Sequence, residues 1–282
     1  MSATREVVAQ DDHGLRALLL SFLLILFITV VAVPIIANRL AGGDVAPHVL
    51  AISTAEQILV LGGVSAYLLR RSHVPVKWRA APRSGWSVVR LTALTVYTFA
   101  VARVLGDVVT WLEVGFTNNP GLVQVPTSMT VAELVVSIVL LGAVPAVFEE
   151  LYYRMTVCWL LAARHRPGMV ILVGAVLFAI AHVTGGPSAV PGALVLGVVL
   201  MAEYVRERNI AVVVAVHFLY NVLSLVFSNV IVWPTDPVHV STQASSAGDC
   251  LERGLVYLAG VLLLCAIPLL WRGTRGQRAP AW

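Results

Sequence analysis

Long apolar runs separated by short polar connectors dominate the pattern of this chain. A helix needs about 20 consecutive apolar residues to cross the hydrocarbon core of a bilayer. Eight runs approach or exceed that length, and the connectors carry breakers such as Pro75, Pro82 and Pro120. The runs lie at residues 17–38, 49–69, 88–112, 129–163, 169–186, 189–205, 210–233 and 254–271. The pattern therefore predicts an all-α fold, a polytopic bundle of about eight transmembrane helices.

Composition supports a membrane protein. The chain is 59% hydrophobic and 12% charged, with a mean hydropathy of +0.87, whereas about 25% of residues are charged in soluble domains. The net charge is +4, yet the basic residues gather between the apolar runs, as in loops beside a bilayer. We therefore expect a multi-pass protein of the cell membrane, with the lipid bilayer and no nucleic acid among its partners.

The distribution of basic residues predicts the orientation. If the N-terminus is cytoplasmic and each run crosses once, 15 of the 19 basic residues face the cytoplasm. Such a bias is expected for cytoplasmic loops. The connector 70–90 alone contributes six of them, and the outer side receives only Arg39 and Arg253. Eight crossings with both termini cytoplasmic satisfy this rule.

We divide the chain into four parts. Residues 1–16 form an N-terminal tail, and 17–128 hold the first three spans with their loops. Residues 129–233 form the core that carries the candidate chemistry, and 234–282 hold an outer loop, the last span and a basic tail.

One run is too long for a single straight crossing. Residues 129–163 would form a helix of roughly 52 Å at 1.5 Å per residue, against a core of about 30 Å. Pro145 removes a backbone donor shortly before Glu149 and Glu150. We therefore expect a kinked, over-long helix or a span with a short bent element, and the two glutamates at a break in regular structure.

The charged residues of this run are costly at membrane depth. Each one costs about 2.5–3.5 kcal/mol at the centre of a spanning helix, so such residues are functional candidates by default. Glu150 and Arg154 are four apart and share a helix face, which predicts an internal ion pair. Glu149 is turned about 100° away on a helix and is free to face another partner.

Two further pairs, each with residues four apart, occur in later runs. Phe178 precedes His182, and His217 precedes Asn221. Hydrolysis of an amide needs a base for water and a donor for the developing oxyanion. Glu149 with His182 can supply the first, and His217 with Asn221 the second. These residues therefore complete a hydrolytic site without a serine or cysteine nucleophile.

The three patterns resemble the motifs of the CPBP family, which includes CAAX proteases, bacteriocin-processing and Abi-like membrane proteins. The segment from Glu149 to Arg154 is similar to its EExxxR motif. Phe178–His182 is similar to its FxxxH motif and His217–Asn221 to its HxxxN motif, in the family's order. The resemblance covers about 130–225. Met155 departs from the family pattern, which often has glycine after the arginine.

The resemblance implies an intramembrane endopeptidase that acts on a membrane-associated protein or peptide. By analogy, Glu149 and His182 would activate water, and His217 and Asn221 would form the oxyanion site. Glu150 and Arg154 would support them. The resemblance does not determine the substrate or whether prenylation matters.

Three alternatives stay open. The residues Glu149, His182 and His217 form a ligand set suited to zinc, although we favour a metal-free mechanism without a cofactor. The same fold could serve as a non-catalytic scaffold or immunity-type protein. A proton-coupled transporter would also use buried acids and histidines, but no matching pair of interrupted helices is visible in the two halves.

Overall fold

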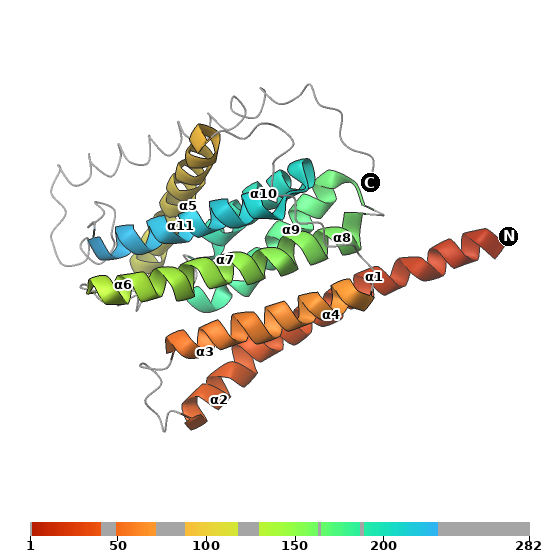
Figure 1. Cartoon of the computed structure of the whole chain (residues 1–282), viewed down its shortest axis with the longest axis horizontal. Coiled ribbons are helices and arrows are strands. Elements are labelled where there is room, and N and C mark those ends of the chain that lie inside the picture. Colours follow the sequence, from red (N-terminus) through yellow and green to blue (C-terminus); the bar gives the residue numbers. More distant parts are fainter. Residues whose placement is uncertain are drawn as a thin grey trace.

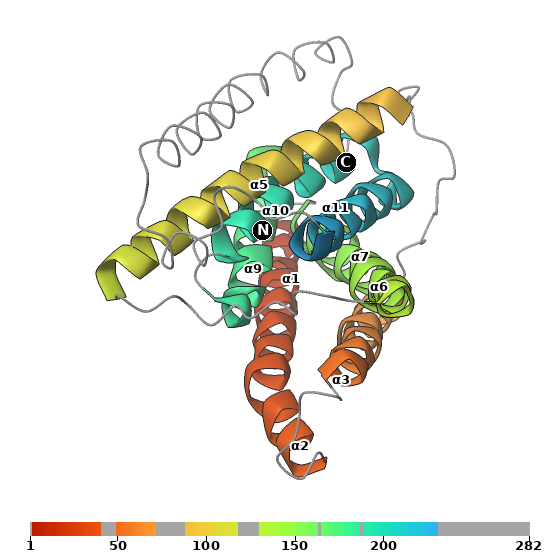
Figure 2. The same cartoon turned by 90° about the vertical axis from the view of Figure 1, so that its left-hand side faces the viewer.

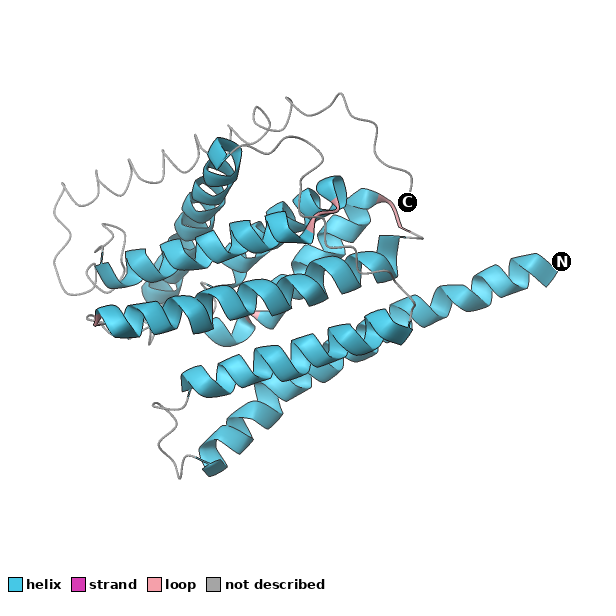
Figure 3. Ribbon diagram, viewed as in Figure 1, coloured by secondary structure: helices cyan, strands magenta, loops and turns pink. Residues whose placement is uncertain are grey.

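The computed structural model describes residues 2–40, 49–71, 88–117, 130–162, 165–186 and 189–230. All regular structure in these ranges is helical and they contain no strand, as Figure 3 shows. The predicted all-α fold is therefore confirmed for the described part of the chain. The last predicted span, 254–271, and the rest of the part 234–282 lie outside the described residues.

Several rods combine α-helix with π-helical turns, in which the backbone hydrogen bonds reach one residue further. The first two rods are α1 (Ser2–Phe27), η1 (Ile28–Ala32) and α2 (Val33–Leu40), followed by α3 (Val49–Glu56), η3 (Gln57–Gly62) and α4 (Gly63–Arg71). The third is α5 (Val88–Thr117). The fourth comprises α6 (Val131–Ser137), η4 (Ile138–Ala143), α7 (Val144–Glu149), η5 (Glu150–Thr156) and α8 (Val157–Ala162). Then follow α9 (Pro167–Ala181), the 3₁₀ turn η6 (Val183–Gly185), α10 (Ala189–Glu207) and α11 (Ile210–Val230).

The helical stretches match the first seven predicted runs in position. Four of them are long and apolar enough to cross a membrane, at Gly14–Ile36, Ala51–Arg71, Val131–Ala162 and Ala189–Glu207. Three further apolar helices are shorter, at Leu91–Gly106, Pro167–Ala181 and Ile210–Val226. Eight crossings and the cytoplasmic position of both termini stay predictions.

The helix α9 ends earlier than the hydropathy pattern predicts. Its 15 residues span roughly 22 Å, less than the hydrocarbon core of about 30 Å. The apolar run continues to 186 in sequence, but the chain leaves the helix at His182 and reaches a left-handed turn at Gly186, with φ +91°. Only glycine adopts that backbone conformation without strain. The helix stop coincides with breakers that the sequence places just beyond it, Gly185, Gly186 and Pro187.

The long fourth rod is continuous rather than broken. From Val131 to Ala162 it runs as one helix in Figure 1, and it includes the two π segments η4 and η5. Thr130 starts the rod with a capping box, since its hydroxyl accepts from the backbone of Glu133 while that carboxylate accepts from the backbone of Thr130. The glutamates at 149 and 150 lie at the junction of α7 and η5.

The other helices pack around this rod. The helix α9 packs tightly on α10, where a Cβ on Gly197 would lie 3.0 Å from the Cα of Ala175. Small residues allow such close approach between helices in membranes. The helix α5 crosses α10 and α11 in Figure 2, and the rod α3–α4 lies beside α7 and η5. The junction of α7 and η5 is therefore surrounded by the rod α3–α4 and by the helices α9, α10 and α11.

Outward-facing side chains are strongly apolar. On α1, the exposed large side chains include Leu15, Leu19, Leu20, Leu23, Leu24 and Phe27. An aqueous surface would not favour such a face, whereas lipid would. The polar residues of the bundle gather inside instead, and Glu149, Glu150, Arg154 and His217 are all buried.

Candidate active site

Glu150 lies at the centre of a buried ionic cluster. Its Oε2 is 3.0 Å from Nε of Arg154, so the ion pair expected from their spacing is present. Its Oε1 accepts a hydrogen bond from Nδ1 of His217 at 2.7 Å. Glu150 is fully buried and the other two are nearly so. One carboxylate therefore links the EExxxR motif to α11.

Aromatic rings pack against Arg154 and against one another. The guanidinium carbon of Arg154 lies 4.2 Å from the ring centroid of Phe178, which is within the range of a cation–π contact. The ring of Tyr153 meets Phe178 edge-on at 5.2 Å. The distance to Glu150 is that of an ion pair, although the contact lacks hydrogen-bond alignment. Phe178, the first residue of the FxxxH pattern, is thus a platform for the buried charge.

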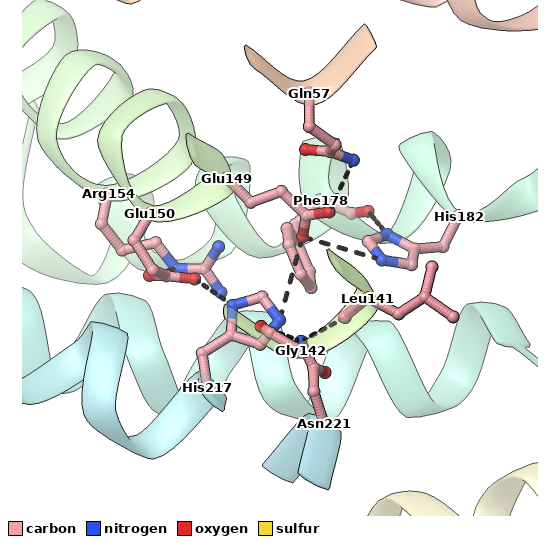
Figure 4. Close-up of polar contacts among 10 residues, drawn as sticks. All are labelled: Gln57, Leu141, Gly142, Glu149, Glu150, Arg154, Phe178, His182, His217 and Asn221. Atoms are coloured by element: carbon pink, nitrogen blue, oxygen red, sulfur yellow. Dashed lines mark hydrogen bonds and ion pairs between the residues drawn. The ribbon is translucent and has the colours of Figure 1, made fainter. Parts of the chain in front are cut away.

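Glu149 faces a different set of partners, as its position predicted. Its Oε1 accepts a hydrogen bond from Nε2 of Gln57 at 3.1 Å. Its Oε2 lies 4.0 Å from Nε2 of His182 and 3.9 Å from Nε2 of His217. This oxygen is buried and has no hydrogen-bond partner among the described residues. Figure 4 shows the carboxylate between Gln57 and the two imidazole rings.

His182 lies at the point where α9 ends. Its Nδ1 is 2.8 Å from the carbonyl oxygen of Phe178. Because a carbonyl oxygen only accepts, Nδ1 carries the hydrogen and Nε2 presents a lone pair toward Glu149 when the ring is neutral. The side chain of His182 is 35% exposed, against 8% for Glu149. His182 is therefore much more open to its surroundings than Glu149.

Asn221 lies one turn after His217 on α11 and reaches the fourth rod. Its Nδ2 donates to the carbonyl oxygen of Gly142 at 3.3 Å and more weakly to that of Leu141 at 3.5 Å. Leu141 and Gly142 both belong to the π segment η4. Asn221 therefore joins α11 to η4 through two backbone carbonyls.

All six site residues predicted from the sequence lie together. Figure 4 shows Glu149, Glu150, Arg154, His182, His217 and Asn221 in one cluster. Three elements distant in sequence supply them, namely the junction of α7 and η5, the end of α9, and α11. Sequence reasoning missed Gln57, although an amide inside the apolar run 49–69 was a visible signal.

The arrangement of the two histidines bears on metal binding. Both rings have Nδ1 hydrogen-bonded to an acceptor and Nε2 turned toward Glu149. Histidines that ligate metals usually have such a partner on the other ring nitrogen. Within the described residues, however, no three His, Cys, Asp or Glu side chains form a group that could hold a metal ion. The zinc alternative stays untested.

Comparison with known proteins supplies an independent result. Residues 131–223, about a third of the chain, match the family model described as "Rce1-like: Type II CAAX prenyl endopeptidase Rce1-like". No curated protein and no solved structure matches the chain. The matched segment contains all three motifs but excludes the first three predicted spans. Residues 131–223 are therefore similar to an Rce1-like type II CAAX prenyl endopeptidase domain, which is consistent with the CPBP and CAAX protease family.

Proposed function

We propose that this protein is an intramembrane endopeptidase that hydrolyses a peptide bond of a membrane-associated protein or peptide. The match of residues 131–223 to the model of a membrane protease family supports a peptidase. The observation that carries the mechanism is the free oxygen of Glu149, which is buried and faces Nε2 of both His182 and His217.

In this mechanism Glu149 is the base. A water oxygen can lie about 2.8 Å from both Oε2 of Glu149 and Nε2 of His182, because those atoms are 4.0 Å apart. Glu149 takes one proton from the water while the neutral ring of His182 accepts the other hydrogen bond. The water oxygen attacks the carbonyl carbon, and the carbonyl π electrons move to its oxygen. When the C–N bond breaks, the proton held by Glu149 goes to the leaving amine.

His217 and Asn221 stabilise the oxyanion. Nδ1 of His217 donates to Glu150, so Nε2 can also donate only in the imidazolium form. The carboxylate of Glu150 balances that charge, and it also forms the ion pair with Arg154. The amide of Asn221 has two hydrogens, and one of them suffices for the carbonyl of Gly142. The roles of Glu150 and Arg154 are thus electrostatic support.

The deciding experiment compares Glu149→Gln with wild type. Purified protein in proteoliposomes is assayed with a peptide ending in a CAAX-type sequence, prenylated or not. Membrane peptides that accumulate in Glu149→Ala cells supply further candidate substrates. We expect Glu149→Gln to lower kcat by at least roughly 10³-fold, because the base is lost while the shape is kept. Cleavage of the prenylated peptide alone would make prenylation part of recognition.

The matched control is Glu133→Gln. This residue is exposed on the same rod and belongs to the capping box, in which glutamine also functions. The control should retain wild-type cleavage. Wild-type turnover in Glu149→Gln would disprove the mechanism. A cellular phenotype that survives Glu149→Gln would instead support the scaffold or immunity-type alternative.

The zinc alternative makes a separate prediction. The Nδ1 partners of His182 and His217 are of the kind that zinc ligands have, so the test is direct. We expect full activity after strong chelation and no stoichiometric zinc by elemental analysis. Activity that is lost on chelation and restored by zinc would establish the metal-dependent version, with Glu149 as a ligand rather than the base.

A further inference from the structure

Gln57 contributes to the site from outside the matched domain. It begins the π segment η3 in the second rod, whereas the family match starts at residue 131. Its Nε2 donates to Oε1 of Glu149 at 3.1 Å, and Figure 4 shows it approaching the carboxylate from the side opposite His217. A residue 92 positions away in sequence thus contacts the proposed base directly.

The other polar atom of the Gln57 side chain, its amide oxygen, is not stabilised by a hydrogen bond among the described residues. This atom, Oε1, is buried. A buried amide oxygen without a partner is unfavourable in an apolar surrounding. The bond to Glu149 is therefore the feature that explains a glutamine at this point of an apolar helix.

Close packing holds Gln57 in place. The side chain of Phe148 lies against Gly62, where an added Cβ would be 2.8 Å from the ring. Only glycine lets η3 approach α7 this closely. On the neighbouring position, Glu56 accepts a hydrogen bond from Thr29 of η1. The second rod is thereby fixed between the first rod and the helix that carries Glu149.

The hydrogen bond also selects the orientation of the carboxylate. With Oε1 held by Gln57, the other oxygen is the one that faces the imidazoles of His182 and His217. A neutral N–H donor stabilises an ionised carboxylate without adding a competing proton source. The hydrogen bond also restricts rotation of the Glu149 carboxylate about its last side-chain bond, a torsion that otherwise has a broad distribution.

We propose that Gln57 is a positioning residue, which aims Oε2 of Glu149 at the attacking water through its amide hydrogen bond. This inference rests on the proposed function, since it presumes that Glu149 is the base. It extends the catalytic machinery to the second rod and makes the matched domain incomplete without that rod.

The first test is Gln57→Met, which keeps the length of the side chain and removes the donor. We expect kcat to fall by roughly 10-fold or more with KM unchanged, because a hydrogen bond to a charged group is lost at the base rather than at the substrate. Ser65→Ala is the matched control, a buried polar residue about two turns further along the same rod whose hydroxyl has no hydrogen-bond partner among the described residues. It should leave kcat and KM as in wild type.

The second test separates positioning from folding. Glu149→Asp withdraws the carboxylate by about one C–C bond, beyond the reach of the Gln57 amide. Adding Gln57→Met to Glu149→Asp should therefore lower kcat by less than twofold, whereas the same change in wild type costs roughly 10-fold. Equal losses in both backgrounds, or a raised KM with unchanged kcat, would overturn the positioning role. If Glu149→Gln is inactive while Gln57→Met has wild-type kcat, only the inference about Gln57 fails.

Discussion

The two glutamates of one motif occupy contrasting surroundings. Glu150 has short contacts to its partners, 2.7 Å to His217 and 3.0 Å to Arg154, in a fully buried cluster. Glu149 has long contacts to the two histidines, 3.9 Å to Nε2 of His217 and 4.0 Å to Nε2 of His182, and His182 is partly exposed. Adjacent residues in the sequence thus face a closed side and an open side of the same site.

This difference in surroundings matches the two proposed roles, in which Glu150 supports the site and Glu149 reacts with water. Short contacts on the closed side leave no room between the charges, so removing one partner should mainly affect folding. Distances near 4 Å on the open side fit a water molecule that donates to both the Glu149 carboxylate and Nε2 of His182, so substitutions there should mainly affect kcat. Three substitutions test this division.

The largest effect is expected for His182→Ala on the open side. In the proposed mechanism His182 orients the water that Glu149 deprotonates, and loss of a group that takes part in acid–base activation of water typically costs 10²–10⁴-fold in rate. We expect kcat to fall by about that factor, with little change in the thermal unfolding midpoint in detergent. His165→Ala makes the same change at an exposed position outside the helices and should retain full activity. A large drop in stability for His182→Ala would erase the contrast between the two sides.

Arg154→Met examines the closed side. Removing one partner of a buried ion pair leaves an uncompensated charge on Glu150, and we expect the free energy of unfolding to fall by about 3–5 kcal/mol. Arg166→Met, at an exposed position before α9, should change it by less than about 0.5 kcal/mol. Equilibrium unfolding in mixed micelles measures both. A variant as stable as wild type but inactive would move Arg154 from support to catalysis.

Asn221→Ala gives the smallest of the three effects. Loss of one oxyanion donor typically lowers kcat by about 10²–10³-fold, and the weak contacts to Leu141 and Gly142 at 3.3–3.5 Å should contribute little to stability. Ser224→Ala, about one turn further along α11, is the control because its hydroxyl bonds within the same helix, donating to the carbonyl of Tyr220. Wild-type kcat in Asn221→Ala would leave His217 as the only proposed oxyanion donor.

Local spacing explains why most of the site could be predicted from the sequence. Residues four apart share a helix face, so Glu150 and Arg154 had to meet, and Glu149 had to face elsewhere. The contact between Gln57 and Glu149 depends on how two rods pack, which no local spacing encodes. The expected break near Pro145 is replaced by π turns in a continuous helix, because a missing N–H can be accommodated by a change of hydrogen-bond register.

The π segments have a consequence for how the site responds to change in length. Each of the four in the described residues contributes to the polar contacts, through Thr29, Gln57, the carbonyls of Leu141 and Gly142, and Glu150 with Arg154. A π turn accommodates one residue more than an α turn. Deleting a single apolar residue from η4 would restore the α register and leave the two flanks in phase, whereas the same deletion from a neighbouring α segment would rotate one flank by about 100° relative to the other. The orientation of Glu149 therefore depends on the number of residues in its rod as well as on its hydrogen bonds, and an insertion or deletion that spares every polar side chain can still turn it away from the histidines.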